Sequence, residues 1–199
     1  MTRGRPQEFD RETALGKAMQ LFWSQGYQAA GMQALTEHMG ISKQSLYNTF
    51  GDKHGLLKEA IDYYSKQLCT NWGKILTASS SPLKNLDGFL KFVESYLFSK
   101  NFRGCLFANT ALEMGHKDPV IQKLLKTRNE EINSQIEEVL NRAVKEGELV
   151  SSVDTQALAR FIFNNIRGLM VTAKGGGSKA EIQDVLNSLR THLKQFEQK

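Results

Sequence analysis

Side chains suited to hydrogen bonding with nucleic-acid bases are concentrated between Lys43 and Phe50. If this segment is a helix, Leu46 and Phe50, four positions apart, lie on one face and turn toward a core. Lysine can donate to guanine in the major groove of DNA, and glutamine or asparagine can pair with adenine. The residues left outside this face or at its edge are Lys43, Gln44, Ser45, Tyr47 and Asn48.

Phosphate contacts are expected from the same region. The hydroxyl of Tyr47 can donate to a phosphate oxygen, and Lys43 and Lys53 can contact phosphates through their charge. The alternative interpretation of this surface is a solvated polar helix face with no partner. Which interpretation holds depends on the elements that position the helix.

The elements before Lys43 are those of a helix-turn-helix. Residues 32–39 carry apolar side chains at helical spacing, and Gly40 can adopt the left-handed conformation that ends a helix. Ser42 is a suitable N-cap, and Ile41 and Leu46 form the apolar pair of a hydrophobic staple. A short link of this kind between two helices is typical of a helix-turn-helix, which favours the DNA-contacting interpretation.

The N-terminus adds a short basic arm, Arg3-Gly-Arg-Pro6. Gly4 and Pro6 prevent a regular helix, and arginines on an extended arm suit the narrow minor groove of A·T-rich DNA. We therefore expect Arg3 and Arg5 to contact the minor groove. A basic terminus without a role is the alternative.

Residues 22–53, and above all the segment GISKQSLYNTFGDK, closely resemble the DNA-binding head of the TetR family of bacterial repressors. The resemblance implies an all-α fold, and a homodimer that binds a palindromic operator on double-stranded DNA and releases it when a ligand binds the larger domain. It also implies two domains. These are a DNA-binding head over residues 1–52, with residues 1–8 as its arm, and an effector-binding and dimerisation body over residues 53–199.

One departure from the family pattern lies at the start of the second helix. Ala30 and Gly31 stand where the family usually has threonine or serine. A hydroxyl cap and a phosphate contact are therefore expected to be missing at this position.

The remainder of the chain predicts further helices. Three prolines in the whole chain scarcely interrupt helical periodicity, and no alternating β-branched segment bounded by turns occurs. We expect an all-α fold with about nine helices, those of the body spanning residues 53–77, 83–99, 104–115, 118–146, 154–174 and 179–196. The apolar stripes of the last two helices predict a four-helix dimer interface, with packing inside one subunit as the alternative.

The middle of the chain is rich in large apolar residues, among them Phe89, Tyr96 and Phe107. Such a set commonly forms a core, but the family resemblance implies an effector cavity enclosed by these helices, and apolar pockets with a few polar groups are typical ligand sites. The polar contacts that we expect there are Asn109, Glu113 and Asn165.

Cys105 follows Arg103-Gly104 and is predicted to begin a helix. Unpaired backbone N–H groups at a helix start, together with the charge of Arg103, favour a thiolate. Cys105 is therefore a candidate sensor of oxidants or electrophiles, and the Gly-Cys pair resembles a TetR subgroup that includes such sensors. Close packing of two helices with an inert thiol is the alternative.

Composition restricts the other classes of function. The net charge of +5 permits nucleic-acid binding, and no nucleophile and base pair, phosphate loop or complete metal-ligand set occurs. We therefore expect neither an enzyme nor a cofactor. No apolar run could cross a membrane, and a cytoplasmic location is expected. The sequence predicts a ligand- or redox-responsive regulator, with a helical small-molecule-binding or interaction protein lacking an operator as the alternative.

Overall fold

The computed structural model describes residues 9–198 and is built from α-helices throughout this range. The all-α prediction is confirmed, and no helix described is long and apolar enough to cross a membrane. Arg3 and Arg5 lie outside the described residues. The nine helices of residues 9–198 are α1 (Arg11–Gln25), α2 (Met32–Met39), α3 (Lys43–Phe50), α4 (Lys53–Leu76), α5 (Pro82–Leu97), α6 (Leu106–Met114), α7 (Pro119–Lys145), α8 (Thr155–Lys174) and α9 (Lys179–Lys194).

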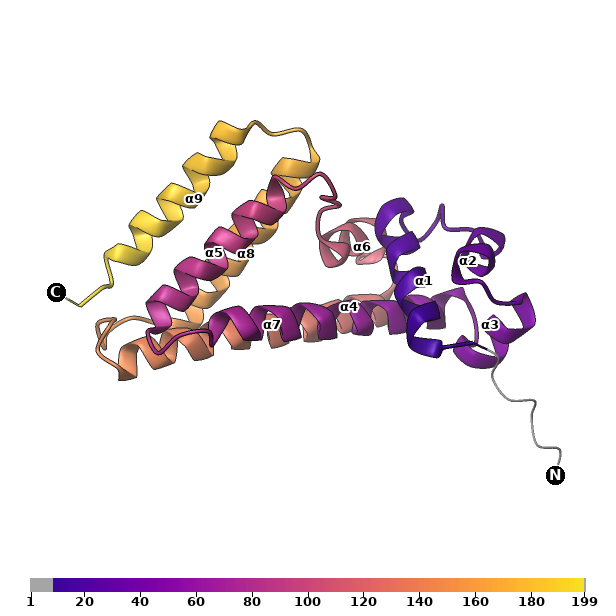
Figure 1. Cartoon of the computed structure of the whole chain (residues 1–199), viewed down its shortest axis with the longest axis horizontal. Helices are drawn as coiled ribbons and strands as arrows, with labels where there is room; N and C mark the ends of the chain where they lie inside the picture. Colours follow the sequence, from indigo (N-terminus) through magenta and orange to yellow (C-terminus); the bar gives the residue numbers. More distant parts are fainter. Residues whose placement is uncertain (1–8, 199) are drawn as a thin grey trace, which may run out of the picture.

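The helices are arranged as a small head and a larger body (Figure 1). Helices α1, α2 and α3 form the head at one end of the molecule, and α5, α8 and α9 lie at the other end. The long helix α4 extends from the head into the body and packs on α1, α5 and α7. Helix α4 therefore links the head to the body.

Local caps fix where the helices of the head begin. The side chain of Asp10 accepts a hydrogen bond from the N–H of Thr13, 2.5 Å away, and Asp52 accepts one from Gly55 at 2.6 Å. Such side-chain oxygens satisfy backbone donors that a helix leaves unpaired at its start. The same kind of cap therefore sets the first residue of α1 and of α4.

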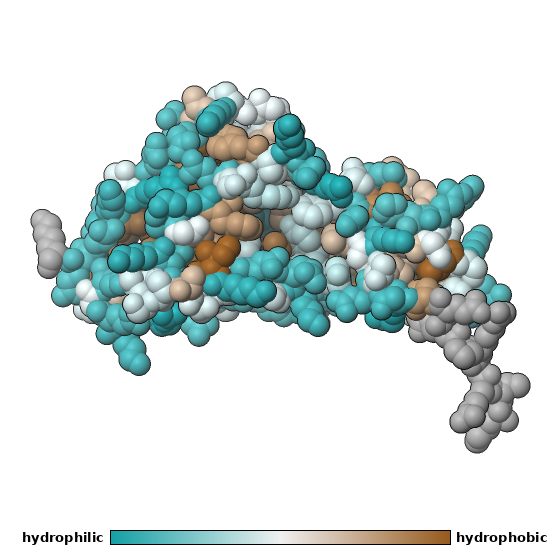
Figure 2. All heavy atoms as spheres, in the orientation of Figure 1, coloured by the Kyte–Doolittle hydropathy of each residue, from teal (hydrophilic) through white to brown (hydrophobic). Residues whose placement is uncertain are grey.

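One cluster of buried apolar side chains extends from the head into the body. Leu35 and Leu46 are fully buried in the head, Leu56 at the start of α4, and Phe89 and Ile136 further into the body. The surface in view is mostly hydrophilic, with hydrophobic residues exposed in the middle of the body (Figure 2). Because the core is continuous, a change of packing in the body can be transmitted to the head.

Candidate nucleic-acid interface and ligand cavity

The turn between α2 and α3 holds the recognition helix in place. Gly40 ends α2 in the left-handed conformation, with φ +73°, and its N–H donates to the carbonyl of Thr36 at 2.9 Å. Ser42 begins α3 by accepting a hydrogen bond from the N–H of Ser45 at 3.0 Å. Leu46 is fully buried and anchors α3 against the core. These contacts form the helix-turn-helix predicted from the sequence.

The outer face of α3 presents the predicted polar residues to solvent. Lys43, Gln44, Tyr47 and Asn48 are exposed. Ser45 is half-buried, and the hydroxyl of Ser42 donates to its hydroxyl oxygen at 2.9 Å. The face therefore consists of long or amide-bearing side chains on a helix whose inner face is fixed, which is the arrangement that major-groove reading requires.

Lys53 lies apart from this face, beside the turn between α1 and α2. Its ammonium donates to the carbonyl of Gln28 at 3.3 Å and lies 4.6 Å from the centre of the Tyr27 ring. Burial lowers the pKa of Lys53 below its ordinary value. A phosphate contact by Lys53 stays a prediction, and the structure places that side chain where it also holds the α1–α2 turn.

The first turn of α2 lacks a side-chain cap. Gly31 is the N-cap residue, in an extended conformation, and among residues 9–198 no side chain caps the free N–H groups of the helix start. This confirms the missing hydroxyl cap expected from Ala30 and Gly31. The unpaired N–H groups are left available to a phosphate.

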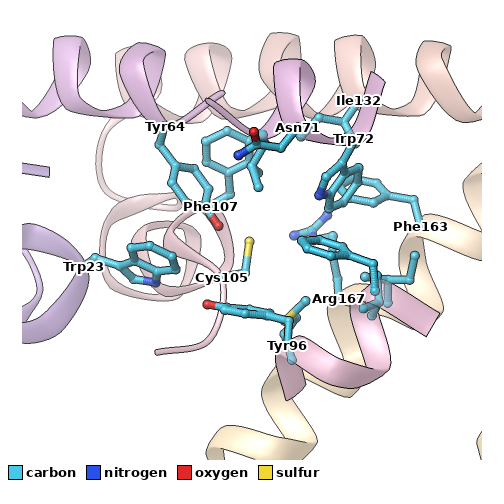
Figure 3. A pocket seen from close by; sticks show the side chains of 15 residues that line it. Trp23, Tyr64, Asn71, Trp72, Tyr96, Cys105, Phe107, Ile132, Phe163 and Arg167 are labelled. Carbon is cyan, nitrogen blue, oxygen red and sulfur yellow. The ribbon is translucent and has the colours of Figure 1, made fainter. Parts of the chain in front are cut away.

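A cavity of about 110 Å³ lies in the body, between α4, α5, α7, α8 and the start of α6. Aromatic rings from several helices surround it, and Tyr64, Tyr96, Cys105 and Arg167 point toward the same space (Figure 3). The head contributes one wall residue, Trp23 of α1. The remaining lining residues are Leu68, Asn71, Trp72, Phe92, Val93, Phe107, Ile132, Phe163, Ile166 and Met170.

Three of the residues predicted for an effector site line this cavity: Tyr96, Cys105 and Phe107. Phe89 does not line it, because its ring is fully buried behind Trp72, with ring centres 4.6 Å apart. The side chain of Asn165 donates to the carbonyl of Phe161, one turn earlier on α8, at 2.8 Å. Asn165 does not line the cavity.

Asn109 and Glu113 were also predicted as pocket contacts, and the structure places both elsewhere. They line a separate, open groove on the surface, which they share with residues 23–26 at the end of α1. The separation follows from the position of α6, whose start contributes to the cavity while its later turns pack against the head. Glu113 thus belongs to the contact between body and head.

Trp23, Trp72 and Arg167 line the cavity but were not predicted as site residues. Within α8 a signal was present, because residues 163, 166, 167 and 170 have the spacing of one helical face. Trp23 offered no such signal, since it comes from the head and reaches the cavity only through tertiary packing.

The polar atoms of the cavity wall are few. The hydroxyl of Tyr96 donates to the carbonyl of Gly104 at 3.1 Å, and burial raises the pKa of both Tyr64 and Tyr96. Cys105 is the N-cap residue of α6, is 8% exposed and makes no capping hydrogen bond. Its thiol and the Tyr64 hydroxyl point toward one another (Figure 3).

One set of polar contacts joins body and head, and another fixes the start of α4. The Glu113 carboxylate accepts hydrogen bonds from the N–H groups of Tyr27, at 2.8 Å, and Gln28, at 2.7 Å. At the start of α4, Nε2 of His54 lies 2.7 Å from the carboxylate of Asp118, which is also the N-cap of α7. Helix α6 is therefore joined to the head, and α7 to the start of α4, at defined points.

Comparison with protein families explains this arrangement. A family model described as "Bacterial regulatory proteins, tetR family" matches residues 14–60, and one described as "Tetracyclin repressor-like, C-terminal domain" matches residues 82–189. The chain belongs to the TetR family. The resemblance found in residues 22–53 is thereby confirmed, while membership of a Gly-Cys subgroup stays a prediction.

Individual relatives cover nearly the whole chain. The HTH-type transcriptional repressor ComR of Escherichia coli is 27% identical over 92% of this chain and 89% of its own length. An uncharacterized HTH-type transcriptional regulator, YezE of Bacillus subtilis, is 29% identical over 91% of this chain and 94% of its own length. A structure of the TetR family regulator CifR, a cysteine mutant complexed with 26bp double-strand operator DNA, superposes with a TM-score of 0.82 at 32% identity, covering 94% of this chain and 97% of that one.

Proposed function

We propose that this chain is a transcriptional repressor, not an enzyme, that binds a palindromic operator as a homodimer and releases it when an effector occupies the cavity. The observation that carries the proposal is the exposed polar face of α3, held outward by the buried Leu46 and the Ser42 cap. The operator complex of CifR and the repressor ComR, whose lengths this chain nearly covers, support it. Head and body correspond to residues 1–52 and 53–199.

Each predicted DNA contact has a distinct role in the proposal. Gln44 and Asn48 read base edges, Lys43 donates to guanine or phosphate, and Ser45 and Tyr47 contact the backbone beside them. Lys53 holds a phosphate from its place beside the α1–α2 turn. Arg3 and Arg5, which lie outside the described residues, enter the minor groove.

Dimerisation is assigned to α8 and α9. Phe161 and Val171 of α8 and Val185 of α9 are exposed apolar residues in the single chain, by 43%, 51% and 38%. Two helices from each subunit would form a four-helix interface that covers them. A two-fold dimer of this kind sets two recognition helices about 34 to 36 Å apart, one turn of DNA.

Control of DNA binding is assigned to the cavity. Its walls include Trp23 of the head and the start of α6, whose later residue Glu113 holds the α1–α2 turn. An effector that binds better to the released form shifts the equilibrium away from the operator, by its difference in affinity for the two forms.

A reactive thiol is a second means of control, favoured by the place of Cys105 in the cavity wall. An alkylating electrophile would form a C–S bond at Sγ, with loss of its leaving group and of the thiol proton to water. The added group would then occupy the cavity in the same way as a bound effector.

Selection of binding sites from random double-stranded DNA tests the proposal. The purified protein is expected to enrich a palindrome whose half-sites are one helical turn apart. A regulator also shows a steep decrease of affinity with salt, because phosphate contacts release counterions. A protein that enriches no sequence would instead fit a helical small-molecule-binding or interaction protein without an operator.

A further inference from the structure

Among the described residues 9–198, Arg167 is the only charged side chain in the wall of the cavity. The other fourteen of the fifteen residues that line it are apolar, aromatic or neutral polar, and none is acidic. The cavity therefore combines a hydrophobic interior with a single fixed positive charge.

The guanidinium of Arg167 is incompletely paired. Its Nε atom is buried and has no hydrogen-bond partner among residues 9–198, and the guanidinium carbon lies 5.8 Å from the centre of the Phe163 ring. A buried N–H without an acceptor is costly, and the planar fork of arginine matches a carboxylate in two parallel hydrogen bonds. A ligand that brings a carboxylate would satisfy this group.

Aromatic side chains form much of the remaining wall. Trp23 and Tyr64 meet edge to face with centres 5.0 Å apart, and Tyr64 and Phe107 do so at 5.1 Å. Aromatic ligands favour the same edge-to-face and offset geometries. The indole Nε1 of Trp23 is a further buried donor without a partner among the described residues, so a second acceptor on the ligand would also be used.

The size of the cavity restricts the ligand further. An engineered cavity of about 150 Å³ in another protein holds benzene. A cavity of about 110 Å³ is of the same order, which favours a compound with a single ring over a polycyclic molecule or a long acyl chain.

We propose that the effector of this protein is a small aromatic carboxylate, with its ring among the aromatic walls and its carboxylate on Arg167. The assignment deepens the proposed function, because it names the ligand class for the cavity through which control is proposed. It depends on the cavity alone, so binding can be tested without DNA.

Intrinsic fluorescence gives a direct assay. The chain has two tryptophans, Trp23 and Trp72, and both line the cavity. The full-length protein is titrated with benzoate and phenylacetate, and with benzamide and phenylacetamide as neutral counterparts of nearly the same shape. A charge-assisted hydrogen bond predicts that each acid binds at least about tenfold more tightly than its amide.

Variants test whether Arg167 is the cation that causes the preference for the acids. Arg167→Gln is expected to remove the preference for the acid, and Arg167→Lys to retain part of it. Arg160→Gln is the matched control, since Arg160 is exposed on the same helix and does not line the cavity. Thermal unfolding of each variant verifies folding, and the acid and amide comparison in the unchanged protein needs no variant at all.

Equal binding of acids and amides, tighter binding of the amides, or no fluorescence response to any of the four compounds would overturn the assignment. Acids and amides would bind equally if a carboxylate of the second subunit already paired with Arg167. A protein that binds benzoate but no selected DNA would retain the ligand assignment and contradict the repressor function. A protein that binds the operator but does not prefer the acids would retain the repressor function and contradict the ligand assignment.

Discussion

The Glu113 carboxylate accepts a hydrogen bond from the backbone N–H of Tyr27, 2.8 Å away, across 86 positions of sequence. Its second oxygen accepts from Gln28. Helix α6 begins at the cavity, next to Cys105, and carries Glu113 near its other end. This helix therefore connects the ligand cavity directly with the turn that precedes the helix-turn-helix.

Glu113→Gln is expected to weaken the contact between body and head. The amide retains one oxygen acceptor but turns an NH₂ group toward a backbone donor, which costs about 1 to 2 kcal/mol in the free energy of unfolding. Urea denaturation measures this cost. Glu130→Gln, an exposed change on α7, is the control, and equal destabilisation by both substitutions would contradict the role of Glu113.

Asp118 makes the free energy of unfolding depend on pH in the acidic range. Hydrogen bonds, first from the backbone N–H of Ile121 and then from His54, hold the pKa of Asp118 below its ordinary value. Because the folded pKa is depressed, the stabilisation is fully present above the unfolded pKa of about 3.9 and is lost as pH falls through the folded pKa.

Asp118→Asn is the corresponding test, since asparagine remains a good N-cap but does not titrate. The variant is expected to be less stable at neutral pH and to lose less further stability between about pH 5 and pH 2 than the unchanged protein. Denaturation curves over this range measure the difference. Parallel pH profiles for the two proteins would refute the assignment.

Gly31→Ser is expected to stabilise the head by supplying the missing cap of α2. Gly31 already has the extended conformation of an N-cap, and a Cβ atom there meets no atom within 4 Å. Serine should exceed alanine at this position by about 1 kcal/mol, so Gly31→Ala is the control for the change in chain entropy alone. Thermal unfolding of the two variants tests this, and equal stability would show that no cap forms.

Cys105→Ser separates thiol control from reversible ligand binding. Iodoacetamide is expected to release the unchanged protein from its operator but not the variant. Cys69→Ser is the control, because Cys105 lines the cavity and Cys69 does not. Equal release of the unchanged protein and Cys105→Ser would exclude a sensing role for Cys105.

The sequence predicted helix bounds correctly where contacts between near neighbours in the chain determine them. The bounds of α2 and α3 were predicted to the residue, because Gly40 and Ser42 end one helix and begin the next through bonds to neighbours three or four positions away. The division of α3 into buried Leu46 and Phe50 and exposed polar residues followed from the helical period alone.

The cavity was only partly predictable, because tertiary packing decides which residues line it. Phe89 and Tyr96 lie on the same helix, α5, yet only Tyr96 lines the cavity while Phe89 packs behind Trp72. Glu113 has the composition of a pocket contact, but its partners are backbone atoms of the head. Sequence spacing within one helix contains no information about such distant partners.

The central claim is that the exposed face of α3 contacts the operator. It is tested most directly by titrating the labelled, selected operator with protein and measuring fluorescence anisotropy. Lys43→Ala is compared with Lys126→Ala, which removes a lysine that is also exposed, on α7 in the body. Loss of a contact in both half-sites predicts that Lys43→Ala weakens binding about tenfold or more, while Lys126→Ala leaves it unchanged. Equal operator affinity of the two variants would contradict the assignment of α3 as the DNA-contacting helix.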